Sequence, residues 1–498
     1  MAEGGGERLS ERIVVNGAAA ESALEVDGTL RWRSGGGDQC LRLESEVLGL
    51  DVQGTRITVR ALAEAPRSGS ICAFGGASGE RRRVRRDYSL EMPTEAAALR
   101  WSARLMNCMD SLGRPKKLFV ILNPFAGKKS ARTIFEDQIK PILEAGNINY
   151  TVVETKYQNH AQEMTKSLDL PKYDGIVCVS GDGVLVEVVN GLLKREDWAT
   201  AIKMPLGIIP AVALGTGNGM AKSLLDSAGD MYSIANATFA VIRGHKRALD
   251  VATISQKEKI FFSVLALIWG LAADVDIESE KYRWLGSARL DIYAVLRIMN
   301  LRKYHGHFQF IPAPGYENHG EPVKRVDGFK SNYVLTQQEQ GSDSKFKTCG
   351  YQGPENSLDG LEWRSIDGPF ISIWVNNVPF SAENYAPAPK AKFSDGYLDV
   401  VILKDCPKSA ILGMMFNMSD GSYVKSPYII YLKVKALRLE PGKRVGHDTK
   451  GGIIDCDGEV LAIGDAAADS NVQKHFMAYG PLLVTVDQGL ATIFTPVP

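Results

Sequence analysis

Three glycine-rich turns in the first half of the chain carry the residue types of an anion-binding site. They occupy residues 123–129 (NPFAGKK), 180–183 (SGDG) and 215–219 (GTGNG), and each follows an apolar run typical of a buried strand. Glycine lets backbone N–H groups approach an anion closely, and the N-terminus of a following helix adds unpaired donors and a positive dipole. Three such turns in one region predict a phosphorylated ligand, and a nucleotide is the class that we expect.

Asp182, between two glycines of the second turn, is the residue best suited to acid–base chemistry. Its carboxylate could accept a proton from a substrate hydroxyl, as the catalytic aspartate of protein kinases does. The alternative is an ordinary Asx-turn or a helix N-cap, which the residue alone favours equally. The sequence contains no GxxxxGK motif followed by Ser or Thr, so a Walker-type nucleotide site is not supported. The turn GTGNG lacks the third glycine of GxGxxG, so a dinucleotide site is not supported either.

Two further acidic segments could meet a cation. Residues 274–283 (DVDIESEKYR) directly follow the apolar run 260–273, so a carboxylate there could pair with a cationic substrate group beside an apolar pocket. The alternative is a salt-bridged helix on a solvated face. Asp457 and Glu459, on either side of Gly458, could hold Mg²⁺, which binds few protein carboxylates and keeps several waters. A plain hairpin turn is favoured for that segment when it is considered alone.

The elements that position these turns alternate between strands and helices. From residue 117 to residue 250, strand-like runs such as LFVILNP and GIVCVSG alternate with helical spacing in segments such as ARTIFEDQIKPILEAG and VLVEVVNGLLKR. This alternation predicts an α/β lobe with a parallel sheet, which binds ligands at the carboxyl ends of its strands. Residues 251–498 contain mostly strand-like runs, including FFSVLALIW and FISIWVNN. They predict a β-rich second lobe, with a long surface insertion at about 314–367.

A smaller module is expected over residues 1–112. Short alternating runs separated by glycine turns predict an antiparallel sheet, and residues 95–110 have apolar residues at helical spacing. Short strands followed by one amphipathic helix resemble a pleckstrin-homology-like module. The arginines of residues 81–86 could contact anionic lipid head groups, and a solvated hairpin loop is an equally favoured interpretation.

Composition excludes several classes of protein. The chain has 498 residues, of which 45% are hydrophobic and 23% charged, and these values argue against wholesale disorder. Lysine plus arginine equals aspartate plus glutamate at 58 each, which argues against a general nucleic-acid coat. Seven scattered cysteines and an N-terminus without a signal-peptide core predict an intracellular protein with reduced thiols. The apolar run 260–273 is shorter than the about 18 residues that span a bilayer, so we expect membrane contact only at the surface.

Residues 116–464 resemble the sphingosine kinases, within the diacylglycerol-kinase catalytic superfamily. The blocks that carry the resemblance occur in family order: LFVILNPFAGKKSA, VSGDGVLVEVVNGLLKREDW, GTGNGMAKSLL, SVLALIWGLAADVDIESEKYRWLGSARL, FSDGYLDVVILKDCP and GIIDCDGEVLA. SDGSYVKSPYIIYLKVKALRLEPG and the insertion with GYQGPE are similar to the plant members in particular. The resemblance implies an α/β ATP-binding lobe of the diacylglycerol-kinase type over residues 113–250, a β-sandwich lobe that binds lipid, and catalysis in the cleft.

The resemblance also implies roles for individual residues. Asp182 would be the general base that deprotonates the primary hydroxyl of a sphingoid long-chain base. Asp276 would pair with the amino group, and because diacylglycerol has no amine, this favours a long-chain base. The residues that would contact the base are Ser180, Gly181, Asp182, Gly183 and Asp276. Those that would bind ATP are Asn123, Pro124, Phe125, Thr155, Asn159, Glu187, Gly215, Thr216, Gly217, Arg283, Arg289, Asp457, Gly458 and Glu459. Asp457 would hold Mg²⁺, directly or through water.

Two departures from the family pattern leave alternatives open. Residues 212–214 lengthen the third turn to PAVALGTGNG, where the family usually has PAGTGNG, and Ala126 stands where the first turn often has glycine. The expected activity is ATP- and Mg²⁺-dependent phosphorylation of sphingosine, sphinganine or phytosphingosine. The alternatives are a ceramide or diacylglycerol kinase, and a non-catalytic lipid-binding protein with a disabled nucleotide loop. We expect a cytoplasmic protein that associates peripherally with an anionic surface such as the vacuolar or plasma membrane, and no nucleic-acid partner.

Overall fold

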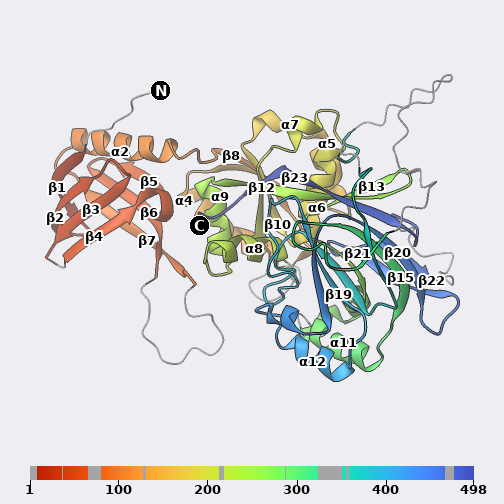
Figure 1. The fold of residues 1–498 in the computed structure, drawn as a ribbon. Coiled ribbons are helices and arrows are strands. Elements are labelled where there is room, and N and C mark those ends of the chain that lie inside the picture. Colours follow the sequence, from red (N-terminus) through yellow and green to blue (C-terminus); the bar gives the residue numbers. More distant parts are fainter. Residues whose placement is uncertain are drawn as a thin grey trace, which may run out of the picture.

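A small N-terminal module lies beside a larger body made of two lobes (Figure 1). The computed structural model describes residues 8–35, 37–65, 80–126, 130–211, 218–285, 288–323, 350–354, 358–465 and 476–497, without the side chains of residues 283, 284 and 465. Residues 212–217, which hold most of the third glycine turn, and residues 324–349 of the expected insertion lie outside this part of the chain.

The N-terminal module is an antiparallel sheet followed by a long helix, as the alternating runs predict. The strand order is β4-β3-β2-β1-β7-β6-β5. The helix α2 begins after Thr94, whose hydroxyl accepts a hydrogen bond from the Ala97 N–H, and it buries Trp101 and Leu105 in the module's core. The elements are β1 (Leu9–Val15), β2 (Ala18–Leu24), β3 (Thr29–Ser34), β4 (Gly37–Arg42), α1 (Leu43–Glu46), β5 (Val47–Gln53), β6 (Arg56–Glu64), β7 (Arg83–Glu91) and α2 (Glu95–Asp110).

The α/β lobe contains the parallel sheet that the alternating pattern predicts. Its parallel strands have the order β11-β10-β8-β9, and helices pack against them. The elements are β8 (Lys117–Leu122), α3 (Ala131–Ile134), a π-helical turn (Phe135–Ile139), α4 (Lys140–Ala145), β9 (Asn149–Glu154), α5 (His160–Ser167), a 3₁₀ turn (Leu170–Lys172), β10 (Gly175–Ser180), α6 (Asp182–Leu193), α7 (Trp198–Ala201), β11 (Leu206–Pro210), α8 (Gly219–Ser227) and α9 (Ile234–Arg243).

The second lobe consists mainly of antiparallel strands, as expected for residues 251–498. Its strands follow the order β22-β21-β14-β18-β19-β20-β23, and β15 pairs with β20. The elements are β12 (Lys246–Gln256), β13 (Lys259–Ser263), β14 (Ala266–Gly270), α10 (Leu271–Glu278), a 3₁₀ turn (Ser279–Leu285), α11 (Ala288–Met299), β15 (Tyr304–Pro312), β16 (Glu321–Pro322), β17 (Arg364–Asp367), β18 (Ser372–Asn376), β19 (Leu398–Leu403), α12 (Lys408–Met415), a 3₁₀ turn (Ser422–Lys425), β20 (Ile429–Arg444), β21 (Lys450–Cys456), β22 (Glu459–Asp465) and β23 (Leu482–Phe494).

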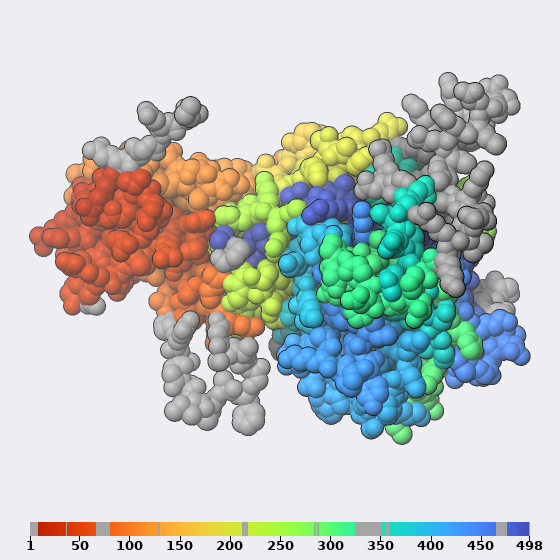
Figure 2. All heavy atoms as spheres, viewed as in Figure 1, coloured from red at the N-terminus to blue at the C-terminus, as the bar shows by residue number. Residues whose placement is uncertain are grey.

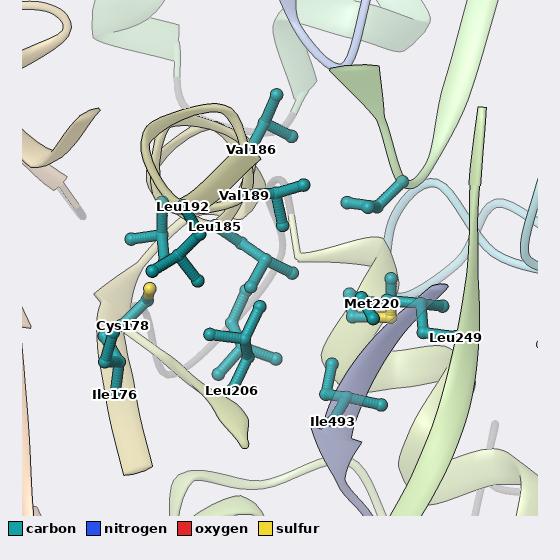
Figure 3. Close-up of a cluster of buried hydrophobic side chains, with 14 of the residues drawn as sticks. Ile176, Cys178, Leu185, Val186, Val189, Leu192, Leu206, Met220, Leu249 and Ile493 are labelled. Atoms are coloured by element: carbon teal, nitrogen blue, oxygen red, sulfur yellow. The ribbon is translucent and has the colours of Figure 1, made fainter. Parts of the chain in front are cut away.

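The strand β23 belongs to both lobes. It pairs parallel with β11 of the α/β lobe through Ile493 and Leu206, and antiparallel with β12 and β20. Figure 3 shows Ile493 in one buried cluster with Leu206 and with the side chains of α6. The two lobes therefore share a continuous sheet and a common core, so the cleft between them is built on a single framework.

The expected strand FFSVLALIW is wrong as a single element, because the chain turns within it. It forms β13 and β14, with Val264 and Leu265 between them. The backbone N–H groups of Val264, Leu265 and Ala266 all donate to the Asp457 carboxylate. The Asp457 carboxylate thus replaces the carbonyl oxygens of a neighbouring strand, which would accept these hydrogen bonds if the strand were continuous.

Two arginines of the 81–86 cluster hold the module on the α/β lobe. Arg81 lies 3.0 Å from the Asp230 carboxylate, and Arg83, with a side chain only 1% exposed, lies 3.5 Å from it. The Arg81 backbone also exchanges hydrogen bonds with Gly229 and Met231. The prediction that this cluster faces lipid is therefore wrong for Arg81 and Arg83. Both side chains pair with Asp230 in the interface between the module and the α/β lobe.

The helices within the described residues are all too short or too polar to cross a membrane. The cysteines in the same part of the chain, Cys40, Cys108, Cys178, Cys406 and Cys456, are not joined in disulfides.

Candidate active site

The first and second glycine turns and the end of β9 lie along one edge of the parallel sheet. The Asn123 N–H donates to Val179 O at 3.1 Å, and the Thr155 N–H donates to Leu122 O at 2.9 Å. The main chain of Ser180 accepts a 3.0 Å hydrogen bond from the Asn218 side chain, which also caps α8. The ends of β8, β9 and β10 are therefore adjacent, as a parallel sheet requires.

The first turn is held by Asn123 and leaves Phe125 in solvent. The Asn123 Oδ1 accepts a 3.0 Å hydrogen bond from the Phe125 N–H, which forms an Asx-turn around Pro124. Phe125 is 63% exposed. This turn therefore presents an exposed apolar ring at the edge of the sheet, and it does not line the cavity described below.

Asp182 connects the second glycine turn to the N-terminus of α8. It is the first residue of α6, and its Oδ2 and Oδ1 accept hydrogen bonds of 2.6 and 3.2 Å from the N–H groups of Gly219 and Met220. The alternative N-cap role is wrong for its own helix, because the side chain caps α8 instead. Burial raises the pKa of Asp182 to about 8 against the opposing effect of these two donors, and the nearby charge of Asp457 adds to the rise.

Asp457 occupies a left-handed turn and closes the break between β13 and β14. Its backbone φ is 54°. Its Oδ1 accepts hydrogen bonds from the Ser263 hydroxyl and from the N–H groups of Leu265 and Ala266, whereas Oδ2 accepts one, from Val264. Burial raises the pKa of Asp457 to about 6 despite these donors. The carboxylate is therefore a structural acceptor through Oδ1, and Oδ2 is the atom with capacity for a further partner.

Glu187 fixes the segment at the end of β9 that the resemblance assigns to ATP. Its two carboxylate oxygens accept hydrogen bonds of 3.0 Å each from the N–H groups of Asn159 and Ala161 at the start of α5. Asn159 adopts a left-handed φ of 67°. Glu187 thus caps the N-terminus of α5, and both of its carboxylate oxygens already accept hydrogen bonds from the protein.

Glu459 faces the second glycine turn from the other lobe. A Cβ at Gly183 would lie 3.8 Å from Glu459 Oε1, and the Gln158 side chain donates to Glu459 Oε2. Burial raises the pKa of Glu459, and Glu187 and Glu280 contribute to the rise. The turn 457–459, the turn 180–183 and the start of α5 therefore meet across the cleft.

Arg289 supplies positive charge to this wall of the cleft. Its Nη1 lies 2.7 Å from Glu280 Oε1, and its side chain is 13% exposed. The Arg283 side chain lies outside the described part of the chain, as do Gly215, Thr216 and Gly217. The structure thus positions one of the two predicted arginines and none of those three turn residues.

One cavity of about 1320 Å³ joins these groups. The predicted residues that line it are Asn159, Gly181, Asp182, Gly183, Asp276, Arg289, Asp457, Gly458 and Glu459. Its far end runs between α11 and α12 and is lined by Leu290, Ile298, Ile411, Met414 and Met418. Asn123, Pro124, Phe125, Thr155, Ser180 and Glu187 lie outside its lining. The cavity is therefore polar and acidic at one end and apolar at the other.

Sequence reasoning missed Asp455, which lies in the cavity wall. Asp455 is on β21, is fully buried and lines the same cavity as Asp276 of α10. Burial raises the pKa of Asp455 well above its usual range, and the adjacent Asp276 carboxyl group adds to the rise. The neighbours of Asp455 along the chain do not mark it, because β21 ends at Cys456 and the proximity to Asp276 arises only in the folded chain.

The acidic groups of the cleft fit a magnesium ion that arrives with phosphates. The charge of Asp457 raises the pKa of both Asp182 and Glu459, whereas the described residues contain no group of three or more side chains arranged as a metal cage. Mg²⁺ commonly binds through one or two carboxylates, phosphates and waters. Asp457 Oδ2 and Glu459 are the oxygen donors here that would suit it.

Comparison with known proteins gives two family models and several relatives. The model of the diacylglycerol kinase catalytic domain matches residues 117–254, and that of the YegS C-terminal NAD kinase beta sandwich-like domain matches residues 357–474. Arabidopsis thaliana sphingosine kinase 1 is 50% identical over 488 residues, covering 98% of this chain and 96% of that protein. Arabidopsis thaliana sphingosine kinase 2 is 51% identical over 485 residues, covering 97% and 96%. Homo sapiens sphingosine kinase 1 is 31% identical over 360 residues, covering 70% and 87%.

Proposed function

The chain belongs to the sphingosine kinases, and from that premise we propose that Asp182 is the general base of an ATP-dependent transfer of phosphate to the primary hydroxyl of a sphingoid base. The observation that carries this proposal is the position of the Asp182 carboxylate. It lines a cavity that is acidic at this end and apolar between α11 and α12. A hydroxyl at the head of a long apolar chain would meet Asp182 when the tail lies in the apolar end.

The N-terminus of α8 and the nucleotide-side turns position the reactants in this proposal. Phosphoryl transfer needs mostly alignment and neutralisation of charge, with little covalent chemistry from the protein. Asp182 takes the hydroxyl proton, and the hydrogen bonds from Gly219 and Met220 hold its carboxylate in place. Arg289 stands on the opposite wall, where its charge would stabilise phosphate oxygens.

Magnesium completes the proposed site. Bound at Asp457 Oδ2 and Glu459, it would supply positive charge to the phosphate oxygens, which the surrounding carboxylates would otherwise repel. Gln158 already orients Glu459 by donating to it. Because Asp457 Oδ1 already accepts three hydrogen bonds from the protein, we propose Oδ2 alone as the Asp457 ligand of the metal.

Asp276 is proposed to distinguish the amine substrate from the neutral lipids of the alternative hypotheses. An ammonium group beside an apolar tunnel needs a carboxylate, because an unpaired buried charge is costly. Asp276 lies on α10 and lines the same cavity as the apolar residues of α11 and α12. Ceramide and diacylglycerol carry no ammonium group, and neither alternative is favoured by the relatives that match over nearly the whole chain.

We also propose that the outer face of α11 contacts an anionic membrane from which the base is taken. The same helix lines the apolar end of the cavity with Leu290 and Ile298. On its other side, Ile292, Val295, Leu296 and Met299 are each at least 41% exposed. A lipid that leaves the bilayer along this helix would remain in apolar contact until it reached the cavity.

The central experiment is a phosphorylation assay of the purified protein with labelled ATP, Mg²⁺ and phytosphingosine. Asp182→Asn should lower kcat by about 10²- to 10⁴-fold, which is the usual effect of a general base. Asp169→Asn, at an exposed residue of the same lobe, serves as the matched control and should retain activity. Equal rates for the wild type and Asp182→Asn would remove Asp182 from the mechanism, and an inactive wild type would refute the function.

A further inference from the structure

Asp455 is a buried acid whose surroundings give it no donor. The residue is 0% exposed, and neither of its carboxyl oxygens accepts a hydrogen bond from an N–H or O–H group in the part of the chain that the structure describes. Its polar neighbour is the carboxyl group of Asp276, whose negative charge raises the pKa of Asp455. A buried carboxyl group without a donor is costly, so an ordinary structural role does not account for it.

Other buried acids of this chain illustrate what a structural role looks like. Asp250 is also 0% exposed, and its two oxygens accept hydrogen bonds of 2.7 and 2.6 Å from the N–H groups of Gly396 and Gly489. Asp399, 1% exposed, lies 2.7 Å from the Lys433 ammonium and accepts a hydrogen bond from the Tyr431 hydroxyl. Asp455 has neither kind of partner among the described residues.

The position of Asp455 indicates where a partner would come from. Asp455 and Asp276 line the same cavity, and so does the apolar residue Ile268, which pairs with Asp455 between β14 and β21. The charged groups that act most strongly on Asp455 are the carboxylates of Asp276, Asp457 and Glu459. The missing group is therefore a cation with several donors, delivered through the cavity. An ammonium group has three N–H donors and satisfies this requirement.

We propose that Asp455 is a substrate-binding residue, which together with Asp276 holds the ammonium group of the long-chain base. This inference rests on the proposed function and adds a second acid to its head-group site. Two carboxylates can each accept one of the ammonium hydrogens, so the site selects a primary amine more sharply than a single acid would. The N-acylated and glycerol-based lipids offer no such group and would leave Asp455 without a donor.

The test uses steady-state kinetics of the full chain with ATP and phytosphingosine, and a plain long-chain alkylamine as a competitive inhibitor. Asp455→Asn should raise KM for the base and weaken inhibition by the alkylamine by about tenfold or more, since one charge-assisted hydrogen bond is lost. KM for ATP should not change. The alkylamine has no hydroxyl groups, so its weaker binding would assign the effect to the ammonium group.

Two further variants separate binding from folding. Asp405→Asn removes the same charge from a residue whose side chain is 88% exposed, and it should leave KM unchanged. Asp455→Ala should not lower the melting temperature, because it removes an acid without a donor, whereas a structural acid would lower it strongly. Unchanged alkylamine inhibition in Asp455→Asn, in a wild type that phosphorylates the base, would overturn this inference and leave the proposed function intact. A wild type without activity on any base would instead refute the proposed function.

Discussion

At the scale of single residues, Asp182 experiences opposing influences on its charge. Burial and the proximity of Asp457 favour the protonated form, whereas the N–H groups of Gly219 and Met220 favour the carboxylate. The balance raises the pKa of Asp182 to about 8. A general base with a pKa in this range is stronger than an ordinary aspartate, so the environment suits the proton transfer assigned to it.

The raised pKa of Asp182 predicts a rising pH profile. Because the base must be ionised, kcat/KM for the sphingoid base should increase with pH as Asp182 loses its proton, with a midpoint far above the ordinary aspartate range and approaching about 8. The substrate amine can contribute only a falling limb, since it loses its charge at high pH. Initial rates measured from about pH 5 to 9 test this, and a profile that is flat over that range would contradict it.

The pH dependence of the free energy of unfolding is the control for this activity profile. The folded state binds the Asp182 proton more tightly than the unfolded chain does, so the free energy of unfolding should fall as pH rises from the ordinary aspartate pKa towards 8. Asp182→Asn should remove this part of the pH dependence, as measured by denaturant unfolding at several pH values. An identical dependence in the variant would assign the titration to another group.

Site residues that are marked by their neighbours in sequence can be predicted, whereas those that are marked only by neighbours in space cannot. Asp182 can be found from its neighbours in sequence, because glycines on both sides mark a turn at a strand end. Asp455 becomes informative only through Asp276, which is far away in sequence and adjacent in space. The role of Asp457 as an acceptor likewise depends on amides at the break between β13 and β14, which is far away in sequence.

At the scale of elements, the spacing of apolar residues predicted where helices and strands lie better than it predicted the π-helical turn and the strand break within them. The segment 131–145 has the apolar spacing of one helix, and it is helical throughout, with a π-helical turn directly before α4. Pro141 at the start of α4 has no N–H and crowds the preceding turn, so the wider turn accommodates it. The break between β13 and β14 has no such local signal, because Asp457 causes it from a distance.

The outer face of α11 predicts how membrane binding can be separated from catalysis. Replacing Val295, Leu296 and Met299 by glutamine removes exposed apolar area without touching the cavity lining, so co-sedimentation with anionic vesicles should fall by about tenfold or more. Activity on base dispersed in detergent should remain. Leu99→Gln, at a 66% exposed residue of α2, is the control and should bind vesicles like the wild type. Undiminished vesicle binding of the triple variant would exclude α11 as the contact.

At the scale of the whole molecule, the N-terminal module is packed tightly on the α/β lobe. Gly49 of β5 approaches α4 so closely that a Cβ there would overlap the Ala145 carbonyl oxygen. The two bodies therefore touch through backbone as well as through the arginines that pair with Asp230, and Figure 2 shows them in continuous contact. The sequence predicted the module but not this docking, because the partners lie on separate segments.

Asp230 is expected to carry much of the docking energy. Asp230→Ala removes the buried acid of Arg83 and leaves it only the half-exposed Glu64 at 4.0 Å, so the free energy of unfolding should fall by about 3–5 kcal/mol in denaturant titrations. Asp87→Ala, which removes the exposed partner of Arg85, is the matched control and should have little effect. Similar losses in the two variants would argue that the buried pair has no special role.

The strand β23 has a consequence for how the chain acquires its shape during synthesis. The ribosome finishes β11 long before it makes β23, yet these strands are neighbours in the finished sheet. The nucleotide-side sheet must therefore wait, with an open edge beside β11, until the entire second lobe has been translated. Active-site assembly thus becomes a late event, and a truncated nascent product lacking β23 would expose a hydrophobic edge that chaperones recognise.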